Sequence, residues 1–120
     1  MQSNKLAGER ATFEEAMQIA VPWIGNFDVG ADGDYKSMQT QSAWWAWRRV
    51  SSRPLDIKKP TMKQQELMDD FQDAFGKTLY AVAESPENLF SLGDDGRYKI
   101  PWVLSAWVGW DMAYTMYQVP

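Results

Sequence analysis

Residues 41–47 read Gln-Ser-Ala-Trp-Trp-Ala-Trp, and residues 104–110 repeat the pattern as Leu-Ser-Ala-Trp-Val-Gly-Trp. The two strings lie 63 positions apart, and the match continues upstream without a gap. Between residues 27–47 and 90–110, ten of the 21 aligned positions are identical. Ordinary composition would give about one or two such identities by chance, so the pattern indicates an internal duplication.

The duplicated unit is predicted to be a short helix, a loop rich in Gly and Asp, and a second helix that starts at a Tyr. Repeat 1 covers about 12–50 and repeat 2 about 64–117, joined by a linker at 51–63 within a single domain, 1–120. A weaker upstream match pairs Met17, Ile19 and Ala20 with Tyr80, Val82 and Ala83. The expected fold is therefore mainly α, a small helical bundle of two pseudo-symmetric helix-loop-helix repeats packed about a pseudo-twofold axis.

Capping and turn signals divide the chain into helical segments. Thr12 and Glu15 have the spacing of a capping box, and Pro22 stops the helix that follows. Gly76 interrupts the periodic apolar pattern of a long central segment. The predicted helices are 13–21, 35–50, 61–82 with a possible break at Gly76, a short turn at 85–90, and 101–117.

The tryptophans of the repeated string are expected in the core. Small Ala side chains beside large Trp rings let two helices approach closely while the rings fill the remaining space. With seven Trp, five Tyr and five Phe in 120 residues, aromatic burial should dominate the stability of the fold. The tryptophans assigned to packing are Trp44, Trp47, Trp107 and Trp110.

The first 50 residues also show a family resemblance. It is carried by residues 13–16, the loop at 33–35 and the string at 41–47, and the second copy keeps only Tyr98 and the part at 105–110. These features resemble a module of small accessory proteins of tailed bacteriophages and prophages. The resemblance implies a phage origin and no particular chemistry.

The composition argues against catalysis and against a metal centre. The chain has no Cys and no His, which removes the usual nucleophile, general base and zinc ligands. The Asp residues of the two Gly/Asp loops do not have the spacing of an EF-hand, so they are assigned to turns. We therefore expect no enzyme, no cofactor and no bound metal.

A basic stretch between Arg48 and Lys63 is the first candidate binding surface. It holds six basic residues and one acidic residue, a net charge of +5, whereas the whole chain has a net charge of −4. Trp45 lies about 160° from the core stripe of its helix, so it is predicted to be exposed beside these charges. Trp and Arg are typical of binding hot spots. The candidate partner-binding residues are Trp45, Arg48, Arg49, Arg53, Lys58 and Lys59. A charged, solvated connection between the repeats is the alternative interpretation.

The last helix has a second apolar face, which predicts either central burial or an oligomer contact. Central burial and a homodimer both remain open. The residues of this face are Leu104, Val108, Met112 and Met116.

The favoured function is that of a phage-encoded, non-catalytic protein that modulates or inhibits a host or defence protein by direct contact. One alternative is a nucleic-acid-binding accessory protein that uses the basic stretch at 48–63, although the acidic remainder would repel a long polyanion. A virion or assembly component is a further alternative. No apolar run approaches the ~20 residues that span a bilayer, and the expected location is the host bacterial cytoplasm.

Overall fold

A computed structural model of the chain describes residues 2–24, 26–52, 63–78 and 85–118. The prediction of a mainly helical bundle is confirmed, and within these residues the only β pairing consists of two isolated bridges. The helices are α1 (Gln2–Ala20), α2 (Met38–Ser51), α3 (Gln64–Phe75), α4 (Pro86–Leu89), α5 (Pro101–Ala113) and the π-helical turn η2 (Tyr114–Gln118).

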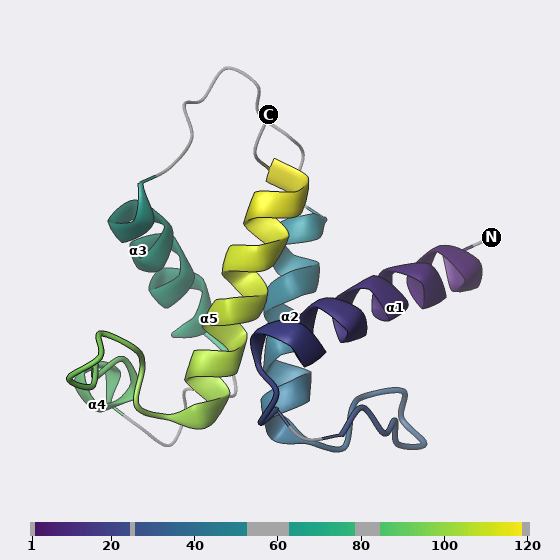
Figure 1. The fold of residues 1–120 in the computed structure, drawn as a ribbon, viewed down its shortest axis with the longest axis horizontal. Helices are drawn as coiled ribbons and strands as arrows, with labels where there is room; N and C mark the ends of the chain where they lie inside the picture. The colour runs from purple at the N-terminus through teal and green to yellow at the C-terminus, as the bar shows by residue number, and fades with distance from the viewer. Residues whose placement is uncertain (1, 25, 53–62, 79–84, 119–120) are drawn as a thin grey trace.

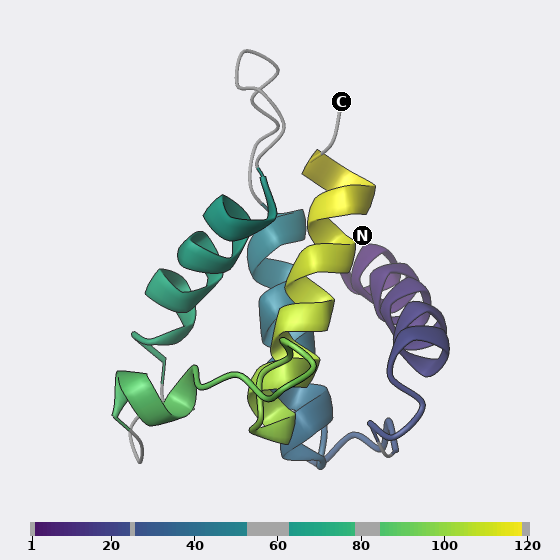
Figure 2. The same ribbon diagram turned by 60° about the vertical axis from the view of Figure 1, so that its left-hand side comes forward.

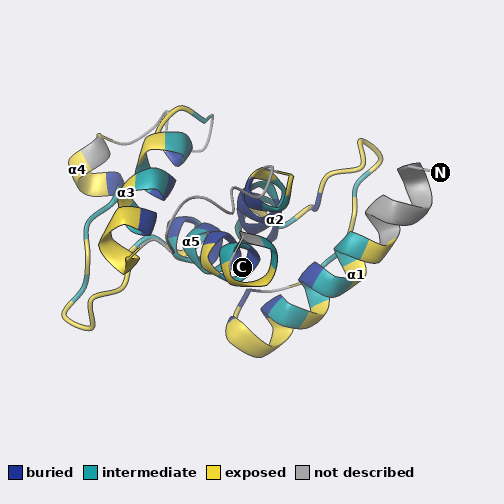
Figure 3. Cartoon of the chain, turned by 90° about the horizontal axis from the view of Figure 1, so that it is seen from above, coloured by how far each residue is buried: buried dark blue, intermediate teal, exposed yellow. Residues whose placement is uncertain are grey.

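Helices α2 and α5 form the centre of the molecule. They lie side by side and run in the same direction, each beginning at the end where the Gly/Asp loops lie (Figures 1 and 2). Their contact is the most extensive between any two elements of the described chain. Helices α1 and α3 flank this pair on opposite sides, and buried residues concentrate on the surfaces that face the pair (Figure 3). The core is therefore divided between two sides of one central helix pair.

Small residues set the close approach of α2 to α5. A Cβ atom built on Gly109 would lie 2.6 Å from the carbonyl oxygen of Ala43, so only glycine fits there. Nearby, the hydroxyl of Ser42 donates to the carbonyl oxygen of Trp102 at 2.8 Å, and that of Ser105 donates to the carbonyl oxygen of Gln39 at 2.8 Å. The Oγ atoms of the two serines are 3.4 Å apart, and both residues are fully buried. Reciprocal polar contacts thus fix the register of the two helices.

The first helix begins earlier than predicted. Residue Thr12 lies inside α1, where its hydroxyl donates to the carbonyl oxygen of Gly8 at 3.1 Å. The capping box proposed for Thr12 and Glu15 is therefore wrong. A Thr hydroxyl can bond the carbonyl four residues back within a helix as readily as it can cap one, and the local pattern does not separate the two.

The other helix bounds differ at their ends. Helix α2 starts at Met38 rather than Tyr35, because Tyr35 pairs with Val29 in a β-bridge and Ser37 is the N-cap. Helix α3 ends at Phe75 with Gly76 as its C-cap, so the break predicted at Gly76 is confirmed. The expected continuation at 79–82 lies outside the described residues, as do Tyr80, Val82 and Ala83 of the weak upstream match.

Two fully buried phenylalanines each hold an aromatic cluster together. Phe13 on α1 contacts Tyr35 and Trp44 with ring centroids 5.8 and 5.0 Å away. Phe71 on α3 contacts Tyr98 and Trp107 at 5.8 and 5.6 Å. The gapless shift of 63 would place Gly76 opposite Phe13. The ring contacts instead match Phe13 with Phe71, which lies 58 positions later. The ungapped upstream match is therefore in the wrong register for these flanking helices.

The predicted core tryptophans are largely where the sequence places them. Trp47 and Trp110 are fully buried, and Trp44 is 6% exposed. Trp107 is half-buried and packs against the core. These rings fill the space between the central pair and its flanking helices.

Candidate functional site

The outer side of α2 carries a shallow depression of about 320 Å³. It unites three of the residues predicted to bind a partner with a neighbouring tryptophan. Its lining residues are Gln41, Trp44, Trp45, Arg48, Arg49 and Ser52. Arg53, Lys58 and Lys59, the remaining predicted residues, lie outside the described part of the chain.

Trp45 is less exposed than the sequence predicts. It is half-buried, with its ring 5.6 Å from that of Phe75 in an edge-to-face contact and 6.2 Å from that of Trp110. The expectation of an exposed Trp was wrong because α3 packs against this side of the central pair. The accessible part of Trp45 lines the depression, and the rest of the ring is held by packing.

The two arginines of the depression have different environments. The guanidinium of Arg48 is 2.6 Å from the Glu9 carboxylate and lies over the ring of Trp44, 5.8 Å from its centroid. Ser51 donates a hydrogen bond to the same carboxylate. Arg49 is exposed and forms no ion pair with any described residue. Arg49 is therefore the cation of this surface that is available to an external group.

The two Gly/Asp loops have nearly the same backbone hydrogen bonds. In the first loop, the Gly30 amide donates to the carbonyl oxygen of Asp34 at 2.8 Å, and the Asp34 amide donates to the side chain of Asp32 at 3.0 Å. In the second loop, the Gly93 amide donates to the carbonyl oxygen of Arg97 at 2.8 Å, and the Arg97 amide donates to the side chain of Asp95 at 3.0 Å. As predicted, these aspartates form turns.

A glycine with positive φ closes each turn. The φ values of Gly33 and Gly96 are 87° and 78°, a region that side chains with a Cβ rarely adopt. Each loop also ends in a β-bridge, Val29 with Tyr35 and Leu92 with Tyr98. The matching sequence positions therefore adopt matching local structure.

The anchors of the two loops differ. Arg10 donates to the carbonyl oxygen of Gly33 at 2.7 Å and lies over the ring of Tyr35, 4.8 Å from its centroid. The residue 58 positions after Arg10 is Met68, which is half-buried and cannot donate to the second loop. The first loop is thus held by a charged side chain from α1, and the second loop has no equivalent anchor on α3.

The tyrosine at the end of each loop bonds a polar residue of the flanking helix. The Tyr35 hydroxyl donates to the Glu14 carboxylate at 2.8 Å, and the Tyr98 hydroxyl accepts from the Gln72 amide at 2.9 Å. Burial raises the pKa of Tyr35, and the adjacent Glu14 carboxylate raises that pKa further. Burial also raises the pKa of Tyr98.

These raised pKa values predict a loss of stability in alkali. Unfolded tyrosines ionise near a pKa of about 10, whereas the folded chain keeps both protons above that pH. Above about pH 10 the unfolded state therefore binds fewer protons, and the free energy of unfolding should fall as the pH rises. Urea unfolding at about pH 9 and about pH 11 measures this fall. The fall should be smaller in the Tyr35→Phe variant, and an equal fall in that variant would contradict the assignment.

The apolar face predicted on the last helix is mostly covered. Leu104, Val108 and Met112 are half-buried and pack against the core. Met116 is 50% exposed and lies in the π-helical turn. Partial central burial thus accounts for three of the four residues, and a homodimer contact through this face stays a prediction.

Two properties of the described residues bear on the class of site. No group of three or more His, Cys, Asp or Glu side chains among them could hold a metal ion. No helix within the described ranges is long and apolar enough to cross a membrane.

Comparison with known proteins finds no match to a protein-family model, a curated protein or a solved structure. The resemblance to phage accessory proteins therefore stays a prediction from the sequence.

Proposed function

We propose that this protein is a non-catalytic binding protein of phage origin that modulates a host or defence protein by contact in the bacterial cytoplasm. The phage origin rests on the sequence resemblance. The observation that carries the binding proposal is the depression on α2, where two tryptophans and two arginines meet on one surface. Trp and Arg are over-represented among the residues that dominate protein interfaces.

The packing of this surface favours binding without reorganisation. Trp44 is 6% exposed and its ring lies 5.0 Å from that of Phe13, while Trp45 packs on Phe75. Arg48 is oriented by its ion pair with Glu9. Side chains that are already ordered lose little conformational entropy when a partner binds, so more of the contact energy contributes to affinity.

A protein partner fits this surface better than a nucleic acid does. The charge of Arg48 is already balanced by Glu9 at 2.6 Å, which leaves Arg49 as the available cation of the depression. Nucleic-acid affinity requires several phosphate contacts by Lys or Arg. With aromatic walls and one available cation among the described residues, the depression is better suited to an acidic and apolar patch on a protein.

The test is capture from bacterial lysate with the tagged protein, with nuclease treatment and identification by mass spectrometry. The captured protein is then purified and titrated against the wild type and the Arg49→Glu variant. We expect Arg49→Glu to weaken binding at least about tenfold, since a buried interface charge pair is typically worth more than 1.4 kcal/mol when one partner is reversed.

Lys77→Glu provides the matched control. Lys77 is exposed, lies outside the depression and, within the described part of the chain, pairs only with Asp73 across one helical turn at 3.4 Å. This charge reversal should leave the affinity unchanged. Equal affinities for wild type and Arg49→Glu would show that the depression is not the binding surface. Capture of nucleic acid alone, lost on nuclease treatment, would overturn the proposal in favour of nucleic-acid binding, and an empty capture would favour a virion or assembly role.

A further inference from the structure

The second Gly/Asp loop lacks one hydrogen bond that completes the first. The main-chain amide of Tyr35 donates to the side-chain oxygen of Gln41 at 2.8 Å. The residue 63 positions after Gln41 is Leu104, which has no acceptor. The main-chain amide of Tyr98 accordingly donates to no described residue, although Tyr98 is only 2% exposed. A main-chain amide without a protein acceptor can donate to an external one.

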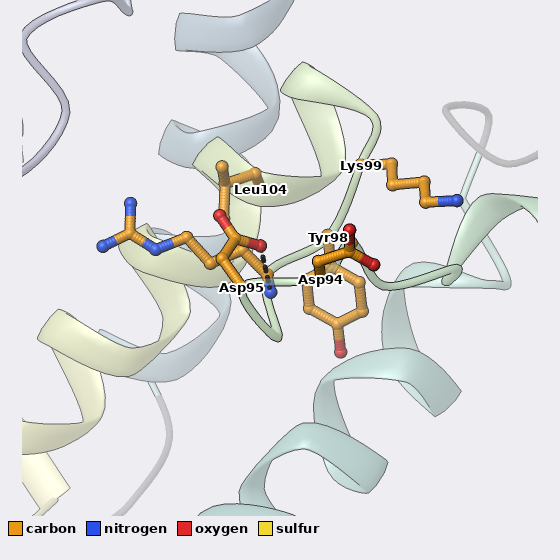
Figure 4. A pocket seen from close by; sticks show the side chains of 7 residues that line it. Asp94, Asp95, Tyr98, Lys99 and Leu104 are labelled. Atoms are coloured by element: carbon orange, nitrogen blue, oxygen red, sulfur yellow. Dashed lines mark hydrogen bonds between the residues drawn. The ribbon is translucent and has the colours of Figure 1, made fainter.

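Tyr98 is one of the residues that line an open cavity of about 530 Å³. Figure 4 shows the side chains of Asp94, Asp95 and Leu104 close to Tyr98, and the side chain of Lys99 directed away from them. Two carboxylates, Asp94 and Asp95, and two cations, Arg97 and Lys99, line the cavity, so the charges of the wall balance. The cavity therefore offers one unused main-chain donor together with carboxylate acceptors and no net charge.

We propose that this cavity binds a side-chain amide, from Gln or Asn, of a partner protein. The amide oxygen accepts from the main-chain N–H of Tyr98, as the oxygen of Gln41 does from that of Tyr35. The amide nitrogen donates to a carboxylate of Asp94 or Asp95, both of which line the cavity. A carboxylate ligand would accept the same amide proton but has no N–H to donate to Asp94 or Asp95, so the side-chain amide is favoured. The inference rests on the proposed function in that the partner is a protein.

The amide resonances of Tyr98 and Tyr35 provide a direct test in the full-length chain. The probes are N-acetyl-glutamine N-methylamide, its norleucine analogue and its glutamate analogue, titrated at millimolar concentration. We expect the glutamine probe to shift the amide resonance of Tyr98 saturably and the norleucine probe to leave that resonance unchanged. The amide resonance of Tyr35 should not change with any of the probes. If the Tyr98 amide resonance does not shift, or if it shifts equally with the norleucine probe, the proposal is overturned. A larger effect of the glutamate probe overturns the choice of an amide.

Two reciprocal substitutions should close the binding site at the Tyr98 amide and open one at the Tyr35 amide. In Leu104→Gln, the new side chain supplies the missing acceptor, so the apparent affinity for the glutamine probe should fall at least tenfold and hydrogen exchange of the Tyr98 amide should slow at least tenfold. In Gln41→Leu, the Tyr35 amide loses its acceptor and should begin to respond to the same probe. Leu104→Met keeps the position apolar and should bind the probe as the wild type does.

The outcomes separate this inference from the proposed function. If Leu104→Gln does not fold, the response of Tyr35 in Gln41→Leu decides the question alone, and no response in that variant overturns the inference. If the probes fail while Arg49→Glu still weakens capture of the partner, only the amide site is rejected. If the probes bind as expected while Arg49→Glu has no effect, the depression on α2 is rejected and the cavity at Tyr98 remains.

Discussion

The Phe71→Ala variant should lose about 3–5 kcal/mol of the free energy of unfolding, the cost typical of removing a fully buried phenylalanine ring. Phe71 is 0% exposed and is the side chain on which the second aromatic cluster converges. Its ring contacts those of Phe75, Phe90, Tyr98, Trp107 and Trp110. The surrounding rings belong to α3, to α5 and to the segment between α4 and α5, and they cannot all move into the cavity, so little of the loss is recovered. Urea unfolding followed by tryptophan fluorescence measures the change.

Phe13→Ala should cost a similar amount because Phe13 has the same place in the first cluster and is also 0% exposed. Leu92→Ala is the control, since Leu92 is 46% exposed and its truncation should change the free energy of unfolding by less than about 0.5 kcal/mol. A loss in Phe71→Ala no larger than that in Leu92→Ala would show that the cluster does not form as described.

Gly109→Ala is expected to be the most damaging substitution after the two phenylalanine truncations. The new Cβ atom would lie 2.6 Å from the carbonyl oxygen of Ala43, a main-chain atom that moves only if α2 moves away from α5. Overpacking of this kind costs about 3 kcal/mol, and the better helix propensity of Ala offsets about 1 kcal/mol. The net loss of about 2 kcal/mol corresponds to a fall of roughly 8 °C in Tm for a domain of this size. Differential scanning calorimetry measures it.

Gly8→Ala is the matched control for this substitution. Gly8 also lies within a helix, and a Cβ atom there would meet nothing within 4 Å. The same chemical change should therefore raise stability by about 0.5–1 kcal/mol through helix propensity alone. A Gly109→Ala variant as stable as Gly8→Ala would mean that α2 and α5 are not in close contact.

The effects of core substitutions on stability and of surface substitutions on partner binding should be separable. Phe71 and Gly109 lie in the interior, and neither lines the depression on α2 or the cavity at Tyr98. Arg49 and Leu104 line one each and lie outside the contact that Gly109 makes. Loss of partner binding in Arg49→Glu with an unchanged Tm would therefore report on the surface, because folding of the core is not disturbed.

The local parts of this protein can be predicted from its sequence alone. The Gly/Asp loops follow from residues that act on their own backbone, because Gly33 and Gly96 adopt positive φ and Asp32 and Asp95 bond the amides two residues on. The helices that carry the repeated Trp string follow from apolar residues at helical spacing. The balance of charge that indicated a surface near Arg48 and Arg49 is also a property of the sequence.

Which of these residues are available to a partner depends on contacts between distant segments of the chain. Packing of α3 covers much of Trp45, and Glu9, 39 positions before Arg48, pairs with that arginine. The equivalence of Phe71 on α3 and Phe13 on α1 follows from how these two flanking helices pack against the central pair. The amide of Tyr98 lacks an acceptor among the described residues because Leu104 stands where the first repeat has Gln41, whose side chain accepts from the Tyr35 amide. Each of these depends on contacts between segments far apart in the chain, whereas patterns of nearby residues report only on local backbone preference and on which helix face is apolar.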